Sequence, residues 1–574
     1  MPSRRVAHIL PAVAAAALAI GVTTLAACAR QDAAATPADL VVVNGRVYPG
    51  GGAPFAEAVA VRGNTVLRVG SNAEIRALAG TATVVVDARG GAVVPGLNDS
   101  HLHIISGGLS LQQAALGEAR SLEELQKVIR EFAAAHPDRP WVLGRGWTYM
   151  AVPGGLPTRQ QLDAAVPDRP AVMVAYDGHT SWANSRALKL AGVTAATPDP
   201  SGGAIVKDPK TGEPTGALKE SAQELVRKLV PAWTRDDRLN AVRAAVAMAH
   251  RYGVTSVQNA GASESDMTLF DELRKAGELK LRLYAAMSVE PEFSEADADA
   301  IDRVRETYGN DPVLKTGAVK MYIDGVIESH TAVMLAPYAN KPVKGEPIWK
   351  PEEFRRVITM LDRRGWQVWV HAIGDGGVRM TLDAFEHAAG ANPAPAMGRR
   401  HRIEHIETVD SADIPRFGTL NVIASQQPFH GTPDSLGVWI PNIGSERASR
   451  GWAYGSISKS GGRVAFGSDW AVVSMDPRIG IHTAVNRTSL DGTPAGGWIP
   501  GQKIPMTAAV DGYTSGAAYA SFDERRKGTL APGMLADIAI FSTDIFGAAP
   551  ERFLDAKVET TIFDGKVVYT RVKQ

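Results

Sequence analysis

The residues of this sequence best suited to chemistry are four histidines and one aspartate, each at the end of an apolar run. They are His101, His103, His371, His405 and Asp469. The apolar runs have the length and the β-branched content of buried strands. Because side chains two apart on a strand point the same way, His101 and His103 can reach one metal ion together. Neutral imidazoles with a carboxylate are a typical site for Zn²⁺ or a similar divalent ion.

A His-x-His pair alone is weak evidence, because such pairs also occur by chance at protein surfaces. The alternative for the whole set is hydrogen-bonded histidines at the points where loops begin. Metal binding is favoured because these residues close strand-like runs, as at Val370-His371 and Gly467-Ser468-Asp469. In a β/α barrel the carboxyl ends of the strands meet at one mouth, which is where active sites lie.

The middle of the chain alternates strand and helix patterns, which indicates βα units and a parallel sheet. Eight barrel strands are expected, at residues 92–97, 254–259, 281–286, 318–323, 367–371, 402–406, 422–426 and 463–467. Helices are expected between most of them, at residues 238–251, 351–365 and 376–389. The gap after the first strand is too long for one helix, so residues 109–235 are predicted to form an inserted subdomain.

Both ends of the chain are β-rich, with short β-branched runs separated by turn signals such as Asn44-Gly45. We expect residues 39–91 and 526–574 to join in one small β-sandwich, beside a barrel domain of residues 92–525. The predicted fold class is therefore α/β. It is a (β/α)8 TIM barrel with a large insertion after the first strand, plus a small β-sandwich formed by both chain ends.

Taken together, these motifs resemble the amidohydrolase superfamily. More narrowly, they look like the branch that includes N-substituted formamide deformylases and related metal-dependent amidases. The stretches that carry the resemblance are residues 95–103, 319–325, 370–375, 402–405 and 467–470. The similarity runs from about Leu40 to the end of the chain, and its motifs say little about the substrate.

The resemblance implies a site with two divalent ions, and Zn²⁺ is the expected metal. By this resemblance, His101, His103 and Asp469 hold one ion, and His371 and His405 hold the other. A hydroxide that bridges the two ions would attack the carbonyl of the substrate. Asp469 would take the proton and pass it to the leaving nitrogen.

Lys320 receives a role from the resemblance alone. In the family, a lysine at the end of the fourth strand is carboxylated by CO2, and the resulting carbamate bridges both ions. A lysine buried beside two dications can be neutral. The alternative for Lys320 is a solvated or salt-bridged lysine.

Other polar and aromatic residues have open roles. His179, in the predicted insertion, would contact the substrate or stabilise the oxyanion, with a structural histidine as the alternative. His330 is a second candidate for substrate contact, and Trp147 would line a pocket or belong to a core. Ligating histidines need acceptors for their second ring nitrogen. Three carboxylates could fill that role or hold turns: Asp99, Asp324 and Glu404.

The first 27 residues resemble a bacterial lipoprotein signal peptide. A basic start is followed by an apolar stretch and by Leu25-Ala26-Ala27-Cys28, which contains the only cysteine of the chain. The sequence predicts an exported lipoprotein anchored to the lipid bilayer through acylated Cys28 and facing the periplasm or the cell exterior. Residues 28–38 would form a tether. The alternative is a free cysteine after an ordinary signal peptide, and the export route stays open.

Composition and charge narrow the function. With 61 basic and 61 acidic residues, nothing supports binding to nucleic acid. The favoured function is hydrolysis of a non-peptide C–N bond, an amide, in a small-molecule substrate. The same site could cleave an ester, a lactone or a cyclic amide. A surface lipoprotein that binds a ligand without turnover is a further alternative, against which the complete ligand set argues. Monomer and homodimer both stay open.

Overall fold

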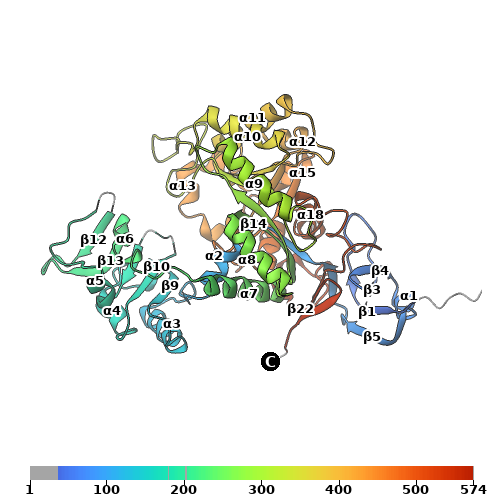
Figure 1. Ribbon diagram of the computed structural model, residues 1–574, viewed down its shortest axis with the longest axis horizontal. Helices are drawn as coiled ribbons and strands as arrows, with labels where there is room; N and C mark the ends of the chain where they lie inside the picture. Colours follow the sequence, from blue (N-terminus) through green and yellow to red (C-terminus); the bar gives the residue numbers. More distant parts are fainter. Residues whose placement is uncertain (1–35, 177, 179, 201–202, 573–574) are drawn as a thin grey trace, which may run out of the picture. The chain divides into compact units, whose positions relative to one another are not determined.

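The computed structural model describes residues 36–176, 178, 180–200 and 203–572 (Figure 1). The chain divides into two units, Met1–Pro37 and Ala38–Gln574, and the description below concerns the second unit. The predicted signal peptide, Cys28 and His179 lie outside the described residues. Within the described part, no helix combines the length and the apolar character that crossing a membrane requires.

Eight parallel strands form the central barrel, and each pairs with the next along the chain. They are β7 (Leu97–Leu102), β14 (Val254–Ala262), β15 (Arg282–Ser288), β16 (Leu314–Tyr322), β17 (Gln367–Ala372), β18 (Arg402–His405), β19 (Ile423–Gln426) and β20 (Arg463–Phe466). A parallel bridge between Leu102 and Trp470 links the first strand to the segment after the last. The predicted (β/α)8 barrel is confirmed.

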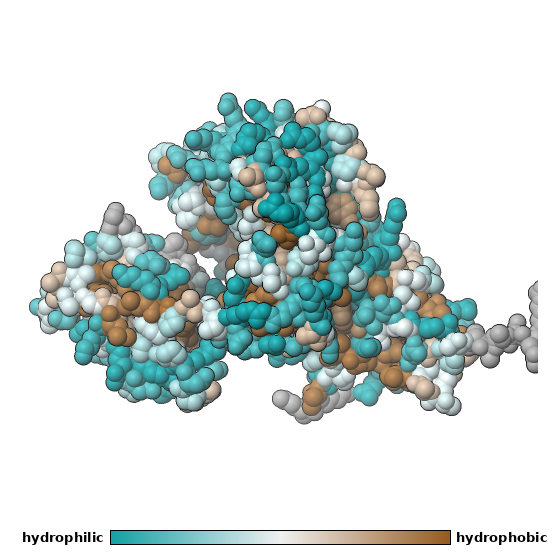
Figure 2. All heavy atoms as spheres, in the orientation of Figure 1, coloured by the Kyte–Doolittle hydropathy of each residue, from teal (hydrophilic) through white to brown (hydrophobic). Residues whose placement is uncertain are grey.

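The strands are apolar because helices cover the barrel from outside. These helices include α7 (Arg235–Arg251), α8 (Glu264–Lys275), α9 (Glu295–Tyr308), α10 (Pro351–Arg363), α11 (Asp375–Ala391), α12 (Ile414–Thr419), α15 (Tyr454–Lys459) and α18 (Ser515–Ala520). Capping boxes at Ser263 and Ser294 start two of them. On the face that Figure 2 shows, hydrophilic side chains cover much of the outer helix layer, as expected for helices whose apolar side packs on the strands.

The expected first barrel strand, residues 92–97, is wrong. Ala92–Pro95 forms β6, which pairs with β21 (Ile538–Phe541) outside the barrel, and the barrel begins only at β7. The chain changes sheets at Gly96, where a Cβ atom would lie 2.2 Å from the Thr255 hydroxyl oxygen. A continuous apolar run hides this change, because both strands are buried.

The two ends of the chain form two further sheets. The first has the order β4-β3-β1-β5, and the second has the order β2-β6-β21-β22-β23. Their remaining members are β1 (Ala38–Val43), β2 (Arg46–Val47), β3 (Ala58–Arg62), β4 (Thr65–Gly70), β5 (Ala79–Asp87), β22 (Val558–Phe563) and β23 (Lys566–Thr570). One apolar cluster joins residues of both sheets, among them Val42, Val59, Val93 and Ile538. Residues from both chain ends therefore share a core.

A six-stranded sheet lies in the insertion between α2 (Ile104–Ser110) and α7. Its order is β12-β13-β11-β10-β9-β8. These strands are β8 (Ala114–Ala115), β9 (Val142–Trp147), β10 (Ala171–Ala175), β11 (Thr180–Ala183), β12 (Gly203–Lys207) and β13 (Pro214–Glu220). The sheet packs with α3 (Leu122–Ala135) around a core that contains Trp147 and Trp182. Trp147 is thus a core residue, and its indole donates to the Met173 carbonyl.

Candidate active site

The carboxyl ends of the barrel strands bring together the described residues that the sequence predicts as metal ligands. His101, Lys320, His371 and His405 lie in the last residues of their strands, while His103 follows β7 and Asp469 follows β20. All of them except His101 line a cavity of about 1090 Å³. The wall of the cavity also contains Tyr176 and Glu220 of the insertion. The insertion therefore contributes to the space in which a substrate would bind.

His101, His103 and Asp469 form a compact group. Oδ1 of Asp469 lies 3.2 Å from Nε2 of His103 and 3.6 Å from Nε2 of His101. One ligand atom of each residue lies within 4.8 Å of the others. Burial opposes the charge on Asp469, but His103, His101 and His405 together hold the pKa of this carboxyl well below its usual range. The group therefore presents a carboxylate beside two imidazoles.

His371 and His405 lie next to this group, with ring centroids 4.4 Å apart. One nitrogen of each ring is held by the protein. Nε2 of His371 donates to the Gly325 carbonyl at 3.2 Å, and Nδ1 of His405 donates to Oε1 of Gln427 at 2.8 Å. Burial, reinforced by Lys320, lowers the pKa of His371 to about 3. Burial, reinforced by His371, also holds the pKa of His405 well below its usual range. Both histidines are thus neutral imidazoles, the form that binds metals.

Lys320 is a buried lysine with an exposed fraction of only 1%. Its Nζ lies 3.6 Å from the centroid of the Tyr322 ring and has no hydrogen-bond partner in the described part of the chain. Burial lowers the pKa of this amine to about 8, although Glu404 and Asp469 oppose the shift. A part of the lysine population is therefore neutral near pH 7, as a reaction of the amine with CO2 requires. The solvated or salt-bridged alternative does not fit this environment.

Unpartnered polar atoms mark the centre of the site. Buried polar atoms in proteins nearly always have hydrogen-bond partners. Three that lack one among the described residues belong to this site: Nε2 of His101, Nζ of Lys320 and Nε2 of His430. Oδ1 of Asp469 is buried with them and has the contact with Nε2 of His103 described above. A mixed set of nitrogen and carboxylate donors is the chemistry that a divalent ion satisfies. The residues present therefore fit the metal centre expected from the sequence.

His430 is a residue of the site that the sequence analysis missed. The seventh strand was predicted, but no functional residue was assigned to its end. His430 comes four residues after that strand ends at Gln426, in the short helix η3 (Pro428–Gly431). The polar run Gln426-Gln427 before Pro428 was the available signal.

Glu404 and Arg402 support the site from inside the barrel. Oε2 of Glu404 accepts from Nδ1 of His101 at 2.5 Å and from Nη2 of Arg402 at 3.0 Å, while Oε1 accepts from Nε of Arg402 at 2.7 Å. Burial alone would raise the pKa of Glu404, but Arg402 and His101 lower it to about 2. Because Nδ1 of His101 is held in this way, Nε2 is the ring nitrogen that faces His103 and Asp469 and is available to a metal ion.

The model of the amidohydrolase family matches residues 84–569. The chain belongs to the amidohydrolase family. It is 35% identical to the protein LONG AFTER FAR-RED 3 of Arabidopsis thaliana over 547 residues. The aligned region covers 93% of this chain and 92% of the relative. It is 25% identical over 548 residues to the N-substituted formamide deformylase of Arthrobacter pascens, covering 93% and 98%.

A solved structure supports the same assignment. The crystal structure of an uncharacterized metal-dependent hydrolase from Pyrococcus furiosus superposes with a TM-score of 0.70 at 27% identity, covering 88% of this chain and 99% of the other. The superfamily predicted from the sequence is thus confirmed. Family and structural relatives together make this amidohydrolase a metal-dependent hydrolase.

Two of the three carboxylates proposed as partners of imidazoles bond to the backbone of this amidohydrolase. Asp324 accepts from the amides of Val333, Ile373 and Gly374, and its Oδ1 lies 3.8 Å from Nε2 of His371. It shapes the loop after β17. Asp99 accepts from the amides of His101 and Ser468 and from the Ser468 hydroxyl, and so ties β7 to the end of β20. Of the three, Glu404 holds an imidazole directly.

His330 lies outside the described lining of the active-site cavity. Its Nε2 bonds to Oδ1 of Asn340 at 3.0 Å, and its ring packs against Tyr338. The neighbouring Glu328 and Ser329 line the cavity instead. A substrate contact by His330 is therefore not supported, while the role of His179 stays a prediction.

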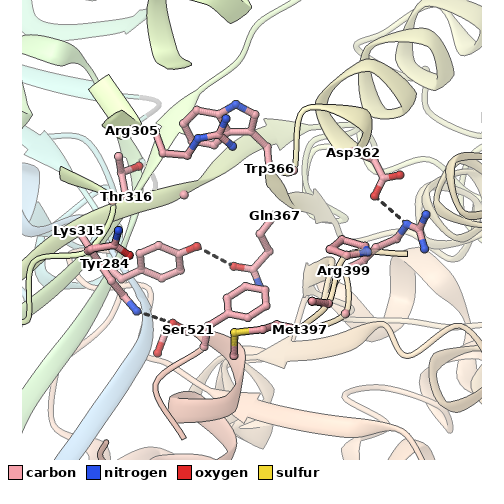
Figure 3. A pocket seen from close by; sticks show the side chains of 18 of the residues that line it. Tyr284, Arg305, Lys315, Thr316, Asp362, Trp366, Gln367, Met397, Arg399 and Ser521 are labelled. Carbon is pink, nitrogen blue, oxygen red and sulfur yellow. Dashed lines mark hydrogen bonds and ion pairs between the residues drawn. The ribbon is translucent and has the colours of Figure 1, made fainter. Parts of the chain in front are cut away.

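A second cavity, of about 550 Å³, lies at the amino-terminal ends of strands β16 and β17 (Figure 3). Several of its polar groups are paired with one another or with neighbours. The Tyr284 hydroxyl donates to Gln367, Arg399 pairs with Asp362 at 2.8 Å, and Lys315 pairs with an aspartate at 2.8 Å. Because active sites of β/α barrels lie at the opposite ends of the strands, this cavity is not the active site of the amidohydrolase.

Proposed function

We propose that this amidohydrolase cleaves a non-peptide C–N bond, an amide, with two divalent ions bound at the mouth of the barrel. The observation that carries the proposal is that the unpartnered buried nitrogens of His101 and Lys320 lie in one site with the buried carboxylate of Asp469. A relative named N-substituted formamide deformylase supports the choice of an amide. Ester, lactone or cyclic amide hydrolysis would use the same residues, so the fold does not separate these reactions.

The residues divide the work around the two ions. Bound divalent ions would act as Lewis acids and lower the pKa of water. The side chains that would hold them are His101, His103, His371, His405, Asp469 and Lys320, the last as a carbamate formed with CO2. Asp469 would accept a proton from the attacking water and deliver it to the leaving nitrogen. Glu404 keeps His101 in the orientation that binding needs.

Metal removal tests the proposed function. We expect dialysis against a strong chelator to abolish the hydrolysis of simple N-acyl amines, and Zn²⁺ to restore it, because the ions activate the attacking water. Turnover would be followed by release of the free amine, with matched esters in parallel. Asp469→Asn, which keeps the side-chain size, is the control and should be inactive on both. Full activity of metal-free protein, or faster turnover of the esters, would contradict the proposal.

Charge in the cavity predicts a preference among substrates. Glu328, Glu407 and Asp434 line the wall, and the described lining contains one lysine, Lys320, and no arginine. Burial and the neighbouring Glu328 hold the pKa of Glu407 well above its usual range, so Glu407 is not counted among the charges of the wall. An acidic wall attracts cations and repels anions. We expect an N-acyl amine that carries an ammonium group to have a higher kcat/KM than a carboxylate analogue of equal size. Glu328→Gln should reduce the difference in kcat/KM between the two substrates. An unchanged ratio of the two kcat/KM values would contradict the proposed preference for cationic substrates.

We further propose that the protein is an exported lipoprotein held on a bilayer by acylated Cys28, as the signal sequence predicts. Cys28→Ser should release the protein into the soluble fraction or block its processing, since the acyl chains provide the anchor. Detergent partitioning of cell membranes measures this, with Ala29→Ser as the control that keeps the cysteine. An intact mass showing an unmodified Cys28 thiol in the native protein would exclude the anchor.

A further inference from the structure

His430 is a histidine of the cavity wall to which neither the sequence motifs nor the resemblance gives a role. It lies in η3, in the loop that follows β19, the seventh strand of the barrel. Its side chain lines the active-site cavity, and its Nε2 is buried. This nitrogen has no hydrogen-bond partner among residues 36–572 as far as they are described. An unpaired imidazole nitrogen at this position points to a group that it would bind.

Other buried histidines show how a structural histidine is satisfied in this chain. Nε2 of His250 lies 2.7 Å from a backbone carbonyl oxygen, and Nε2 of His401 lies 3.1 Å from a carboxylate oxygen. Both ring nitrogens of His482 have partners. Nε2 of His430 shares its lack of a partner with Nε2 of His101, which is a predicted metal ligand.

The position of His430 relative to two predicted ligands is suited to metal binding. One ring nitrogen of His430, one ring nitrogen of His405 and one carboxylate oxygen of Asp469 all lie within 4.8 Å of one another. The rings of His405 and His430 are nearly parallel, with an angle of 6° between their planes and centroids 6.3 Å apart. Because zinc–ligand bonds are about 2.0–2.2 Å long, two atoms that bind one zinc ion lie at most about 4.4 Å apart. Small side-chain movements would therefore bring these three atoms within bonding distance of one ion.

We propose that His430 is a metal ligand, which joins His405 and Asp469 around one divalent ion of the zinc class. The inference rests on the proposed function and assigns one more imidazole to the metal centre. Asp469 then belongs to two groups, because its carboxylate also lies beside His101 and His103. This carboxylate, with two oxygens, is able to contact both ions. The ligand chemistry is that of a borderline-soft ion with nitrogen and oxygen donors.

Metal titration of the full chain tests the role of His430. Zn²⁺ buffered with a chelator would be titrated into metal-free wild type and His430→Ala, and bound metal measured by elemental analysis. We expect wild type to bind two ions and His430→Ala to bind one of them at least about tenfold more weakly, since even indirect partners of ligands change affinity by 10–100-fold. With Co²⁺ in place of Zn²⁺, the visible absorption bands should change, because one imidazole leaves the coordination sphere.

His330→Ala is the matched control, because His330 lies outside the lining of the cavity and should leave metal binding and the Co²⁺ spectrum unchanged. Equal thermal unfolding of the metal-free proteins would show that His430→Ala is folded. Unchanged Zn²⁺ affinity and an unchanged Co²⁺ spectrum in His430→Ala would overturn the inference. Lost turnover with intact metal would overturn it too and place His430 beside the substrate. A wild type that binds no metal would refute the proposed function itself.

Discussion

Lys320→Ala should lower turnover by several orders of magnitude while the protein stays folded. A carbamate on Lys320 would supply one negative charge and two oxygens to two dications, and alanine removes both. The amine is buried and unpartnered within the described structure, so the substitution breaks no hydrogen bond of the fold. Millimolar acetate or propionate should restore part of the activity, because a small carboxylate can enter the gap that alanine leaves. Turnover of an N-acyl amine with and without acetate measures the effect.

Two further variants separate a bridging lysine from a merely buried one. Lys320→Arg should stay inactive, because a guanidinium remains cationic and is not expected to form a carbamate. Lys527 is the matched control: burial lowers its pKa to about 8 as well, but it lies 3.3 Å from Asp523. Lys527→Ala should reduce stability, with no response of turnover to acetate. Near-full activity of Lys320→Arg together with no acetate response in Lys320→Ala would rule out the bridge.

The sequence predicted the barrel because strand patterns alternate with helix patterns and several of the strands end in polar residues. His371 and His405 follow apolar runs, and the parallel arrangement of the strands places both at one mouth. The start of the first strand could not be placed, since the apolar run Ala92–Leu97 continues across Gly96, where the chain passes from β6 of one sheet to β7 of the barrel. Sequence periodicity reports burial, and burial is the same in both.

Sequence patterns do not identify residues whose roles depend on contacts with residues far away in the sequence. Glu404 reaches His101 across 303 positions, and the sequence offered it only as one of three carboxylates. His430 is part of a loop, where no periodicity fixes the direction of a side chain. The roles of both residues could be recognised only in the folded structure, because hydrogen-bond partners and unpaired polar atoms cannot be read from the sequence.

Glu404→Gln should damage both stability and metal binding. Glu404 is the carboxylate partner of Arg402, whose side chain is completely buried, and it also accepts from His101. Glutamine has one acceptor oxygen, so its amide N–H would face either the guanidinium or the imidazole, both of which are donors. Breaking a buried ion pair in this way costs about 3–5 kcal/mol. Denaturant unfolding of the metal-free protein measures this loss, and Zn²⁺ titration should show affinity lower by about 10–100-fold.

A matched control and the pH dependence make the prediction for Glu404 specific. Glu524→Gln alters a similar pair with Arg400 in which the glutamate is 29% exposed, so it should cost about 1 kcal/mol or less. The pKa of Glu404 is lowered from 4.5 to about 2, so its contribution to stability is present above pH 4.5 and is lost as the pH falls toward 2. The difference in unfolding free energy between wild type and Glu404→Gln should therefore be constant near neutrality and shrink in acid. A difference no larger than that of Glu524→Gln, or one that grows in acid, would show that Glu404 does not hold the charge of Arg402 and the ring of His101 in place.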